Sequence, residues 1–209
     1  MIRVETNKQI VYESFDYTDP IGNVADNHTN AGLIEEIEKY FNKTGGLNIL
    51  DIGCAGGQFI VDCFTKGHSA YGIDGVDHVL TNEAAAGHHN WKSYYNKNFF
   101  LADAGEPYTI SDEEIIVKFD CISTWENIEH IFPNNLNNYF TNVSNHLSDG
   151  GIFIGSISTH EADHHPSAFP YEFWEDKFKE NGLTFEPYCF NNKLRECGGS
   201  LYFTSKKIK

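Results

Sequence analysis

Residues 48 to 74 carry the clearest chemical pattern in this chain. A short apolar run containing Asp51 leads into a turn of small residues, Gly53 to Gly57, and a second apolar run ends in Asp74. Glycines in such a turn let the backbone come close to a ligand, and an acidic residue closing the next strand can accept hydrogen bonds from both hydroxyls of a ribose. The pattern predicts a nucleotide-like ligand on a strand, turn, helix and strand. The turn does not read GxGxxG, the form typical of dinucleotide-binding proteins.

Two further groups of reactive side chains follow later apolar runs. Glu126, Glu129 and His130, in STWENIEHIF, are spaced by three and four residues, which would place them on one face of a helix. The stretch STHEADHHPSAFPYEFW, which begins at residue 158, adds His160, His164 and His165. Carboxylates and imidazoles gathered at one place can bind a divalent cation or move a proton.

Apolar periodicity indicates the elements that position these groups. Residues 31–41 (AGLIEEIEKYF) place four apolar side chains on one helical face, which predicts a helix. After residue 74, strands are predicted at residues 98–103, 119–124, 151–156, 185–190 and 199–204, and helices at residues 79–86, 136–147 and 171–181. Residues 1–30 are polar and predicted to be irregular. Strands that alternate with helices indicate an α/β fold with a mostly parallel sheet.

The predicted sheet would bring the reactive groups together. In an open parallel sheet, ligands bind beyond the carboxyl ends of the strands. The residues at these ends are Gly53, Asp74, Asp103, Trp125, Glu126 and the segment 158–160. We therefore expect one cleft with the glycine turn on one side and the glutamate and histidine groups on the other.

The turn at residues 51–59, DIGCAGGQF, resembles the first motif of the class I S-adenosylmethionine (SAM) methyltransferases, DIGCGxGxF. It departs from that motif at Ala55, where most of the family has glycine. The resemblance extends to about Gly182. It implies a Rossmann-like fold with seven strands in the order 3-2-1-4-5-7-6, the last antiparallel, and helices on both faces. The whole chain, residues 1–209, would be one such domain, with residues 1–46 forming a lid and a helix segment.

The same resemblance implies a set of SAM-binding residues. Asp51 and the turn would hold the methionine half, and Asp74 would accept from the ribose diol. Asp103, within FLADAGEP, is similar to the acidic residue that accepts from the adenine amino group. The predicted cofactor residues are Asp51, Gly53, Ala55, Gly57, Asp74, Asp103, Ala104 and Trp125.

The glutamate and histidine group resembles the small-RNA terminal 2′-O-methyltransferases and the ubiquinone-pathway O-methyltransferases, in which it binds a divalent cation. The histidine-rich stretch is similar to one in glycan and natural-product methyltransferases. The implied ligands are Glu126, Glu129, His130 and His165, with His164 as the substitute for His165. Two carboxylates and two imidazoles suit Mg²⁺ or Mn²⁺, and the second imidazole favours Mn²⁺. A cation would activate an acceptor hydroxyl whose proton His160 or His164 could take. The alternative is that His130 only shapes the acceptor pocket.

Composition restricts the acceptor. Thirty acidic residues against fifteen basic ones give a net charge of −15, and the one basic cluster is Lys206, Lys207 and Lys209. Because phosphate contacts by Lys and Arg dominate nucleic-acid binding, a polyanionic substrate is disfavoured. The 40% hydrophobic content suits a substantial core, and the five cysteines, with no close pairs, indicate reduced thiols. With no apolar stretch long enough for a signal peptide or membrane span, we expect a soluble cytoplasmic protein.

These observations favour a SAM-dependent, metal-assisted O-methyltransferase that acts on a sugar hydroxyl of a glycan or nucleotide sugar, with a rhamnose-like acceptor. Three alternatives stay open: an RNA 2′-O-methyltransferase, an O-methyltransferase for a phenol or quinone intermediate, and a non-catalytic SAM-binding partner subunit. The small size and abundant asparagine are similar to glycan methyltransferases of large DNA viruses, which would place the protein in a host cytoplasm. The oligomeric state is left open.

Overall fold

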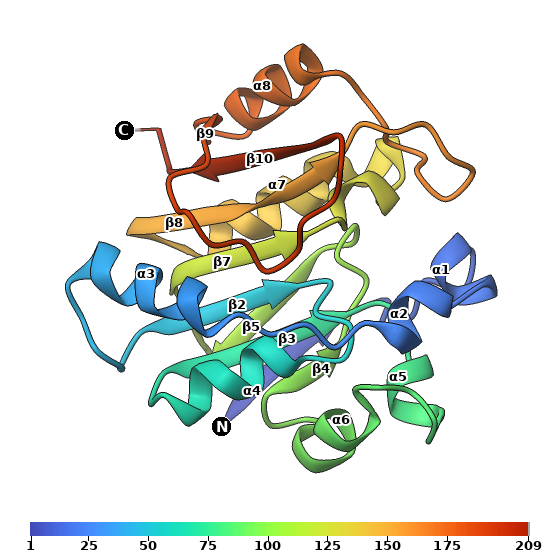
Figure 1. Cartoon of the computed structure of the whole chain (residues 1–209), viewed down its shortest axis with the longest axis vertical. Helices are drawn as coiled ribbons and strands as arrows, with labels where there is room; N and C mark the ends of the chain where they lie inside the picture. The colour runs from blue at the N-terminus through green and yellow to red at the C-terminus, as the bar shows by residue number, and fades with distance from the viewer. Residues whose placement is uncertain (209) are drawn as a thin grey trace.

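The central element of the structure is a sheet with the strand order β4-β3-β2-β7-β8-β10-β9 (Figure 1). The computed structural model describes residues 1–208, and Lys209 of the basic cluster lies outside the described residues. The strands are β2 (Asn48–Ile52), β3 (Ser69–Asp74), β4 (Phe99–Leu101), β7 (Phe119–Trp125), β8 (Leu147–Ser158), β9 (Glu186–Pro187) and β10 (Ser200–Ser205). Strands β4, β3, β2, β7 and β8 are parallel, and β10 is antiparallel to β8. Counted along the chain, the order is 3-2-1-4-5-7-6, so the predicted fold class and topology are confirmed.

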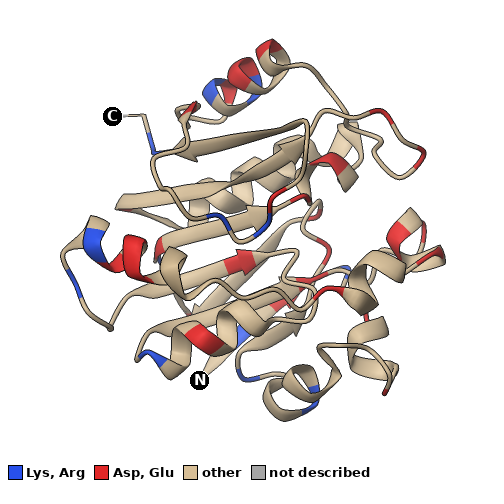
Figure 2. Ribbon diagram, in the orientation of Figure 1, with Lys and Arg blue, Asp and Glu red and all other residues tan. Residues whose placement is uncertain are grey.

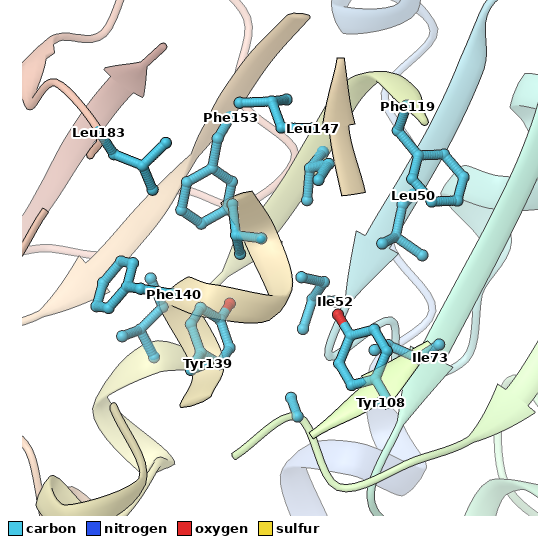
Figure 3. Packing of buried hydrophobic residues seen from close by; sticks show 14 of the residues in the cluster. Leu50, Ile52, Ile73, Tyr108, Phe119, Tyr139, Phe140, Leu147, Phe153 and Leu183 are labelled. Atoms are coloured by element: carbon cyan, nitrogen blue, oxygen red, sulfur yellow. The ribbon is translucent and has the colours of Figure 1, made fainter. Parts of the chain in front are cut away.

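Helices cover both faces of this sheet. Residues of α3 (Ala31–Phe41), α4 (Gln58–Thr65) and α6 (His88–Tyr94) form one buried apolar cluster with one face. Residues of α7 (Leu136–His146) and α8 (Tyr171–Glu180) form a second cluster with the other face (Figure 3). Neighbouring residues of β2 divide between the clusters because successive strand side chains point to opposite faces: Ile49 joins the first and Leu50 the second.

Helix α3 shows how local sequence sets an element's bounds. Its N-cap, Asn30, accepts a hydrogen bond from the amide of Leu33, and Asn42 ends the helix in the left-handed conformation. Leu33, Ile34 and Ile37 are fully buried. The helix spans residues 31–41, as predicted.

The prediction of an irregular segment over residues 1–30 was wrong. Strand β1 (Ile2–Thr6) pairs antiparallel with β5 (Tyr108–Asp112), which also pairs with β6 (Ile115–Ile116) in a second, three-stranded sheet. Two short helices follow, α1 (Phe15–Thr18) and α2 (Ile21–Ala25). The partner of β1 lies about a hundred residues away, so periodicity within the segment carried little sign of the pairing.

Two other predicted elements are shorter than expected. The strand predicted at residues 185–190 is reduced to Glu186–Pro187, because proline has no amide proton to donate to a ladder. The helix predicted at residues 79–86 ends early as α5 (His78–Thr81), where Asn82 accepts a hydrogen bond from the amide of Ala84 and starts a turn. Helix α6 was not predicted. Within residues 1–208, no helix is both long and apolar enough to cross a membrane.

Candidate functional site

A cavity of about 430 Å³ opens at the carboxyl ends of β2, β3 and β7, and residues of α1 and α2 contribute to its wall. Of the predicted site residues, it is lined by Gly53, Ala55, Asp74, Asp103, Ala104, Trp125, Glu126, His130, His164 and His165. The turn and the histidine groups therefore share one cavity, although they are far apart in the chain. Asp51, Gly57, Glu129 and His160 do not line it.

The cavity wall is strongly acidic. Figure 2 shows several acidic residues, coloured red on the ribbon, in the loops at the carboxyl ends of the central strands. The acidic residues that line the cavity are Asp16, Asp19, Asp26, Asp74, Asp103 and Glu126. Among the described residues, Arg195 is the one Lys or Arg in this wall, and its Nη1 lies 2.9 Å from Oδ2 of Asp26. A polyanionic ligand would be repelled by this wall.

Backbone hydrogen bonds hold the glycine turn against the end of β3. The amides of Gly53 and Cys54 both donate to the carbonyl of Ile73. Gly53 has a φ of +74°, and a Cβ there would lie 2.4 Å from the side-chain amide nitrogen, Nδ2, of Asn127. Both features favour glycine at this position. Ala55 occupies the left-handed region with a φ of +42°, which carries strain that the glycine usual in this family would avoid.

Gly57 has a packing role in the structure. Its φ is +75°, and a Cβ would lie 2.2 Å from the ring of Phe99 in β4. This glycine lets helix α4 begin close to the sheet, which fixes the helix that follows the turn.

Asp74 closes β3 as a buried carboxylate that faces the cavity. Its oxygens accept from the amides of Ala55 and Val76, each at 2.9 Å, and more weakly from the side-chain amide of Asn23 in α2. Burial raises the pKa of Asp74 to about 6, and the two backbone hydrogen bonds oppose that rise. The carboxylate therefore belongs to the turn and at the same time contacts the N-terminal segment.

Asp103 lies two residues after the edge strand β4, and it is buried, with 3% of its surface exposed. Its Oδ1 accepts from the amide of Gly105, and its Oδ2 lies 3.1 Å from Nζ of Lys8. The backbone amide of Asp103 also donates to the carbonyl of Lys8. Lys8 was missed from the sequence because β1, which delivers it, was not predicted.

A second, small cavity of about 20 Å³ adjoins the turn and is lined in part by Asp51, Gly53, Trp125 and Arg195. Asp51 is buried and accepts a hydrogen bond of 2.6 Å from Oγ of Ser123. Burial raises the pKa of Asp51 to about 7, and the nearby carboxylates of Asp26 and Asp74 add to the rise. The indole nitrogen of Trp125 is buried there without a hydrogen-bond partner. These groups leave polar atoms available to a ligand beside the turn.

Glu129, His130 and His165 form a compact cluster in which one ligand atom from each lies within 4.8 Å of the others. Glu129 is fully buried, its Oε1 accepts from the amide of Ser158, and its Oε2 has no partner. Burial raises the pKa of Glu129 to about 7, opposed by the neighbouring His130. Burial alone would lower the pKa of His130, but Asp16 and the two glutamates of its own segment raise it.

The two histidines of the cluster have different partners. Nδ1 of His165 lies 2.8 Å from the carbonyl oxygen of His160. A carbonyl can only accept, so this nitrogen carries the proton and Nε2 of His165 stays free as a ligand atom. Nδ1 of His130 instead lies 2.8 Å from Oδ2 of Asp16 in α1. The cluster is therefore oriented from two sides, by its own loop and by the N-terminal segment.

Glu126 lies beside this cluster and is not one of its three members. The three side chains do not share one face of a helix as their spacing suggested, because only Ile128–His130 form a 3₁₀ turn and Glu126 has a left-handed φ of +50°. Its Oε2 accepts from Oγ of Ser200, and its Oε1 is buried without a partner. Its role as a metal ligand stays a prediction, and it would require the side chain of Glu126 to move toward the other three residues.

The two candidate bases differ in position. His164 lines the cavity, with its ring centroid 4.1 Å from that of His165 and 5.6 Å from that of His130. His160 is exposed and does not line the cavity, and it contributes its carbonyl to His165. The geometry therefore favours His164 over His160 for contact with an acceptor.

The model of the methyltransferase domain family matches residues 25–194 of this chain. The chain belongs to this methyltransferase family. The matched region contains the glycine turn, both carboxylates at the ends of β3 and β4, and the whole cluster of Glu129, His130 and His165. The N-terminal segment that carries Lys8, Asp16 and Asn23 lies before it.

Curated relatives of this methyltransferase include two ubiquinone biosynthesis O-methyltransferases. The protein of Rickettsia bellii (strain OSU 85-389) is 30% identical over 128 residues, which are 61% of this chain and 48% of the relative. The protein of Rickettsia prowazekii (strain Madrid E) is 28% identical over 127 residues, 61% of this chain and 45% of the relative. The chain thus spans about half the length of the curated relatives it matches.

Solved structures share the fold at low identity. A SAM-dependent methyltransferase from Clostridium acetobutylicum has a TM-score of 0.62 at 18% identity and covers 91% of this chain and 96% of its own. A 1,6-didemethyltoxoflavin-N1-methyltransferase from Burkholderia thailandensis, solved with S-adenosylhomocysteine, has a TM-score of 0.58 at 15% identity and covers 93% and 84%. The [4+2]-cyclase SpnF has a TM-score of 0.55 at 18% identity and covers 88% and 75%. Because a cyclase shares this fold, the acceptor chemistry must be argued from the site.

Proposed function

We propose that this methyltransferase transfers the methyl group of SAM to a hydroxyl of a small acceptor, with a divalent cation beside the acceptor. One observation carries the proposal: His130 and His165 of the cation cluster line the same cavity as Gly53 and Asp74 of the glycine turn. A cofactor at the turn and a hydroxyl at the cluster would then meet within one cavity, as in-line transfer requires.

The residues around the turn fit SAM. Gly53 and Ala55 present backbone to the cavity without bulky side chains, and buried Asp74 is placed for the ribose hydroxyls. Asp103 and Ala104 line the same cavity, where they would contact the adenine. Arg195 offers the cation that the methionine carboxylate would need, and the surrounding carboxylates suit the sulfonium and the ammonium group. Asp51 and Trp125, in the adjoining small cavity, would contact the methionine end.

The cation cluster fits a hard or borderline divalent cation. Glu129 offers an unpartnered oxygen in a fully buried position, and His165 offers a free Nε2. His130 completes the cluster, and two imidazoles favour Mn²⁺ over Mg²⁺. When bound, such a cation lowers the pKa of an acceptor hydroxyl and fixes its orientation.

His164 is the residue we assign to proton transfer, because it lines the cavity next to the cluster. The acceptor oxygen forms a bond to the methyl carbon as the carbon–sulfur bond breaks. The sulfur keeps the electron pair and leaves as S-adenosylhomocysteine, and the hydroxyl proton passes to the imidazole of His164.

The acceptor we propose is a sugar hydroxyl with a neighbouring hydroxyl, as in a rhamnose-like unit of a glycan or nucleotide sugar. Vicinal oxygens can chelate a cation, and the acidic wall supports an acceptor without a dense array of phosphates. A phenolic acceptor is the second candidate. It is favoured by the apolar side chains of Phe15, Ile131 and Phe132 in the cavity wall and by the relatives' names. RNA is disfavoured by the acidic wall.

The acceptor class is tested by offering radiolabelled SAM and Mn²⁺ with separate pools of rhamnosides and nucleotide sugars, catechols, and short RNA. Label in the saccharide pool supports the proposal. Label in catechols would keep the mechanism but identify a phenol as the acceptor. Label in RNA overturns the acceptor assignment. A Glu129→Gln variant should give no label in any pool, whereas Glu175→Gln, on the exposed side of α8, should label like the wild type.

A further inference from the structure

We infer that Asp16, in the short helix α1, is a further ligand of the divalent cation and that the cation draws this helix over the cavity. This inference rests on the proposed function, because it assumes a cation at Glu129, His130 and His165. Asp16 lies outside the region that matches the family model, so it is a feature of this chain's own N-terminal segment.

The contact between Asp16 and His130 has the spacing of two ligands. Oδ2 of Asp16 lies 2.8 Å from Nδ1 of His130, yet this buried nitrogen has no hydrogen-bond partner by geometry. Two ligand atoms that bind the same cation lie close together in this way, without the alignment of a hydrogen bond. Around an octahedral cation with bonds of about 2.1 Å, adjacent ligand atoms lie about 3 Å apart.

Charge and chemistry also favour Asp16. The cluster by itself offers one carboxylate, Glu129, and two imidazoles. Cations such as Mg²⁺ and Mn²⁺ prefer oxygen ligands, and a second carboxylate would balance both positive charges. Glu126 already accepts from Ser200 through one oxygen. Asp16 has no such hydrogen bond, and its side chain is one-third exposed on the cavity wall.

The position of α1 predicts a movement on cation binding. Asp16 is not among the residues whose ligand atoms all lie within 4.8 Å, so it must shift toward Glu129 and His165 to share their cation. Helix α1 has four residues and is capped by Ser14. Its contact with the histidine-rich loop is a tilted ring pair of Phe15 and His164, with ring centroids 5.2 Å apart. Tyr17 also ties α1 to His78, whose Nε2 lies 2.8 Å from the carbonyl oxygen of Tyr17. A helix of four residues can still shift locally, because it has little backbone structure of its own to break.

The inference is tested by Mn²⁺ titration of the full chain, followed by isothermal calorimetry and by the electron paramagnetic resonance of free Mn²⁺. The variants are Asp16→Asn and Asp19→Asn, a matched control that removes the same charge from the same segment of the cavity wall. We expect Asp16→Asn to weaken Mn²⁺ binding at least about tenfold and Asp19→Asn to change it less than about threefold. Equal affinities in the wild type and Asp16→Asn would overturn the inference.

Amide hydrogen exchange of residues 14–25 provides a second readout that does not depend on activity. Mn²⁺ should slow exchange in this segment of the wild type and of Asp19→Asn, but not in Asp16→Asn. Slowing in all three proteins would also overturn the role of Asp16. Absence of any Mn²⁺ binding by the wild type would instead overturn the cation site itself, which separates failure of the proposed function from failure of this inference.

Discussion

The two halves of the cavity are built in different ways. The centre of the cofactor half comes from one continuous stretch, in which the amides of Gly53 and Cys54 donate to the carbonyl of Ile73 and the amide of Ala55 donates to the side chain of Asp74. The cation half comes from the 3₁₀ turn at residues 128–130, the loop after β8, and helix α1. Its carboxylates keep buried oxygens without partners at Glu126 and Glu129.

This difference indicates which half is complete without a ligand. Buried polar atoms without partners cost free energy, so a structure keeps them where a ligand will satisfy them. In the cofactor half, the amides of Gly53, Cys54 and Ala55 are satisfied internally, so the turn is preformed, and the buried atoms left without partners are Trp125 Nε1 and Asn23 Oδ1. In the cation half, the proposed cation would satisfy the buried oxygens that have no partner. Changes in the two halves should therefore have separable effects on SAM binding and on turnover.

The largest effect is expected for Glu129→Ala in the cation half. Loss of the buried ligand should lower turnover by about 10³-fold, since a cation supplies several kcal/mol of transition-state stabilisation. SAM affinity should stay within a few-fold, measured by calorimetry, because the turn does not contact Glu129. A comparable loss of SAM affinity would contradict the claim that the two halves affect SAM binding and turnover separately.

Asp51→Asn should remove a strong pH dependence of stability from the cofactor half. The pKa of Asp51 is raised from 3.8 to about 7, so the native state binds its proton more tightly than the unfolded state. Its contribution favours the native state below about pH 4 and is lost as the pH rises toward 7, up to about 4 kcal/mol. Urea unfolding at pH 5 and 7.5 should show a smaller loss for Asp51→Asn than for the wild type. Equal losses in both proteins would show that Asp51 is not the group responsible.

Asp74→Ala is the matching change at the ribose position. Losing charge-assisted hydrogen bonds to the ribose should weaken SAM binding by about 2–3 kcal/mol, or roughly 30- to 150-fold. Mn²⁺ affinity should change little, because Asp74 is not part of the cluster. Direct titrations with SAM and with Mn²⁺ check both statements, and an unchanged SAM affinity would contradict the assignment of Asp74.

The smallest effect is expected for Ala55→Gly in the turn. Relief of the left-handed φ at this alanine should stabilise the native state by up to about 1 kcal/mol. Because the turn is already formed, SAM affinity should rise only slightly. Chemical denaturation measures the first change, and a lower stability than that of the wild type would show that the alanine methyl group contributes packing.

The sequence predicted best what depends on contiguous residues. Helix 31–41 was predicted to the residue because its apolar face lies within it, and the turn at residues 51–59 carried the family resemblance that gave the strand order. Most of the cation half followed from that resemblance. Its geometry did not, because residue spacing could not distinguish a full helical turn from the 3₁₀ turn that leaves Glu126 to one side.

The N-terminal contributions could not be read from the sequence. Lys8 acts on Asp103 and Asp16 acts on His130, each across about a hundred residues. No local pattern marks such a pair, since both depend on β1 and α1 docking on distant elements. Arg195 could not be singled out from the sequence either, because the acidic residues around it come together only in the fold.

The central claim is that SAM and a divalent cation act together in this one cavity. Its most direct test is methyl transfer from radiolabelled SAM to a pool of vicinal-diol sugars by the wild type, first in EDTA and then after addition of excess Mn²⁺. We predict no transfer in EDTA and recovery with Mn²⁺, with SAM affinity nearly equal in both conditions. Full transfer in EDTA would contradict the cation's role and leave the SAM-binding half of the site as the part of the account that stands.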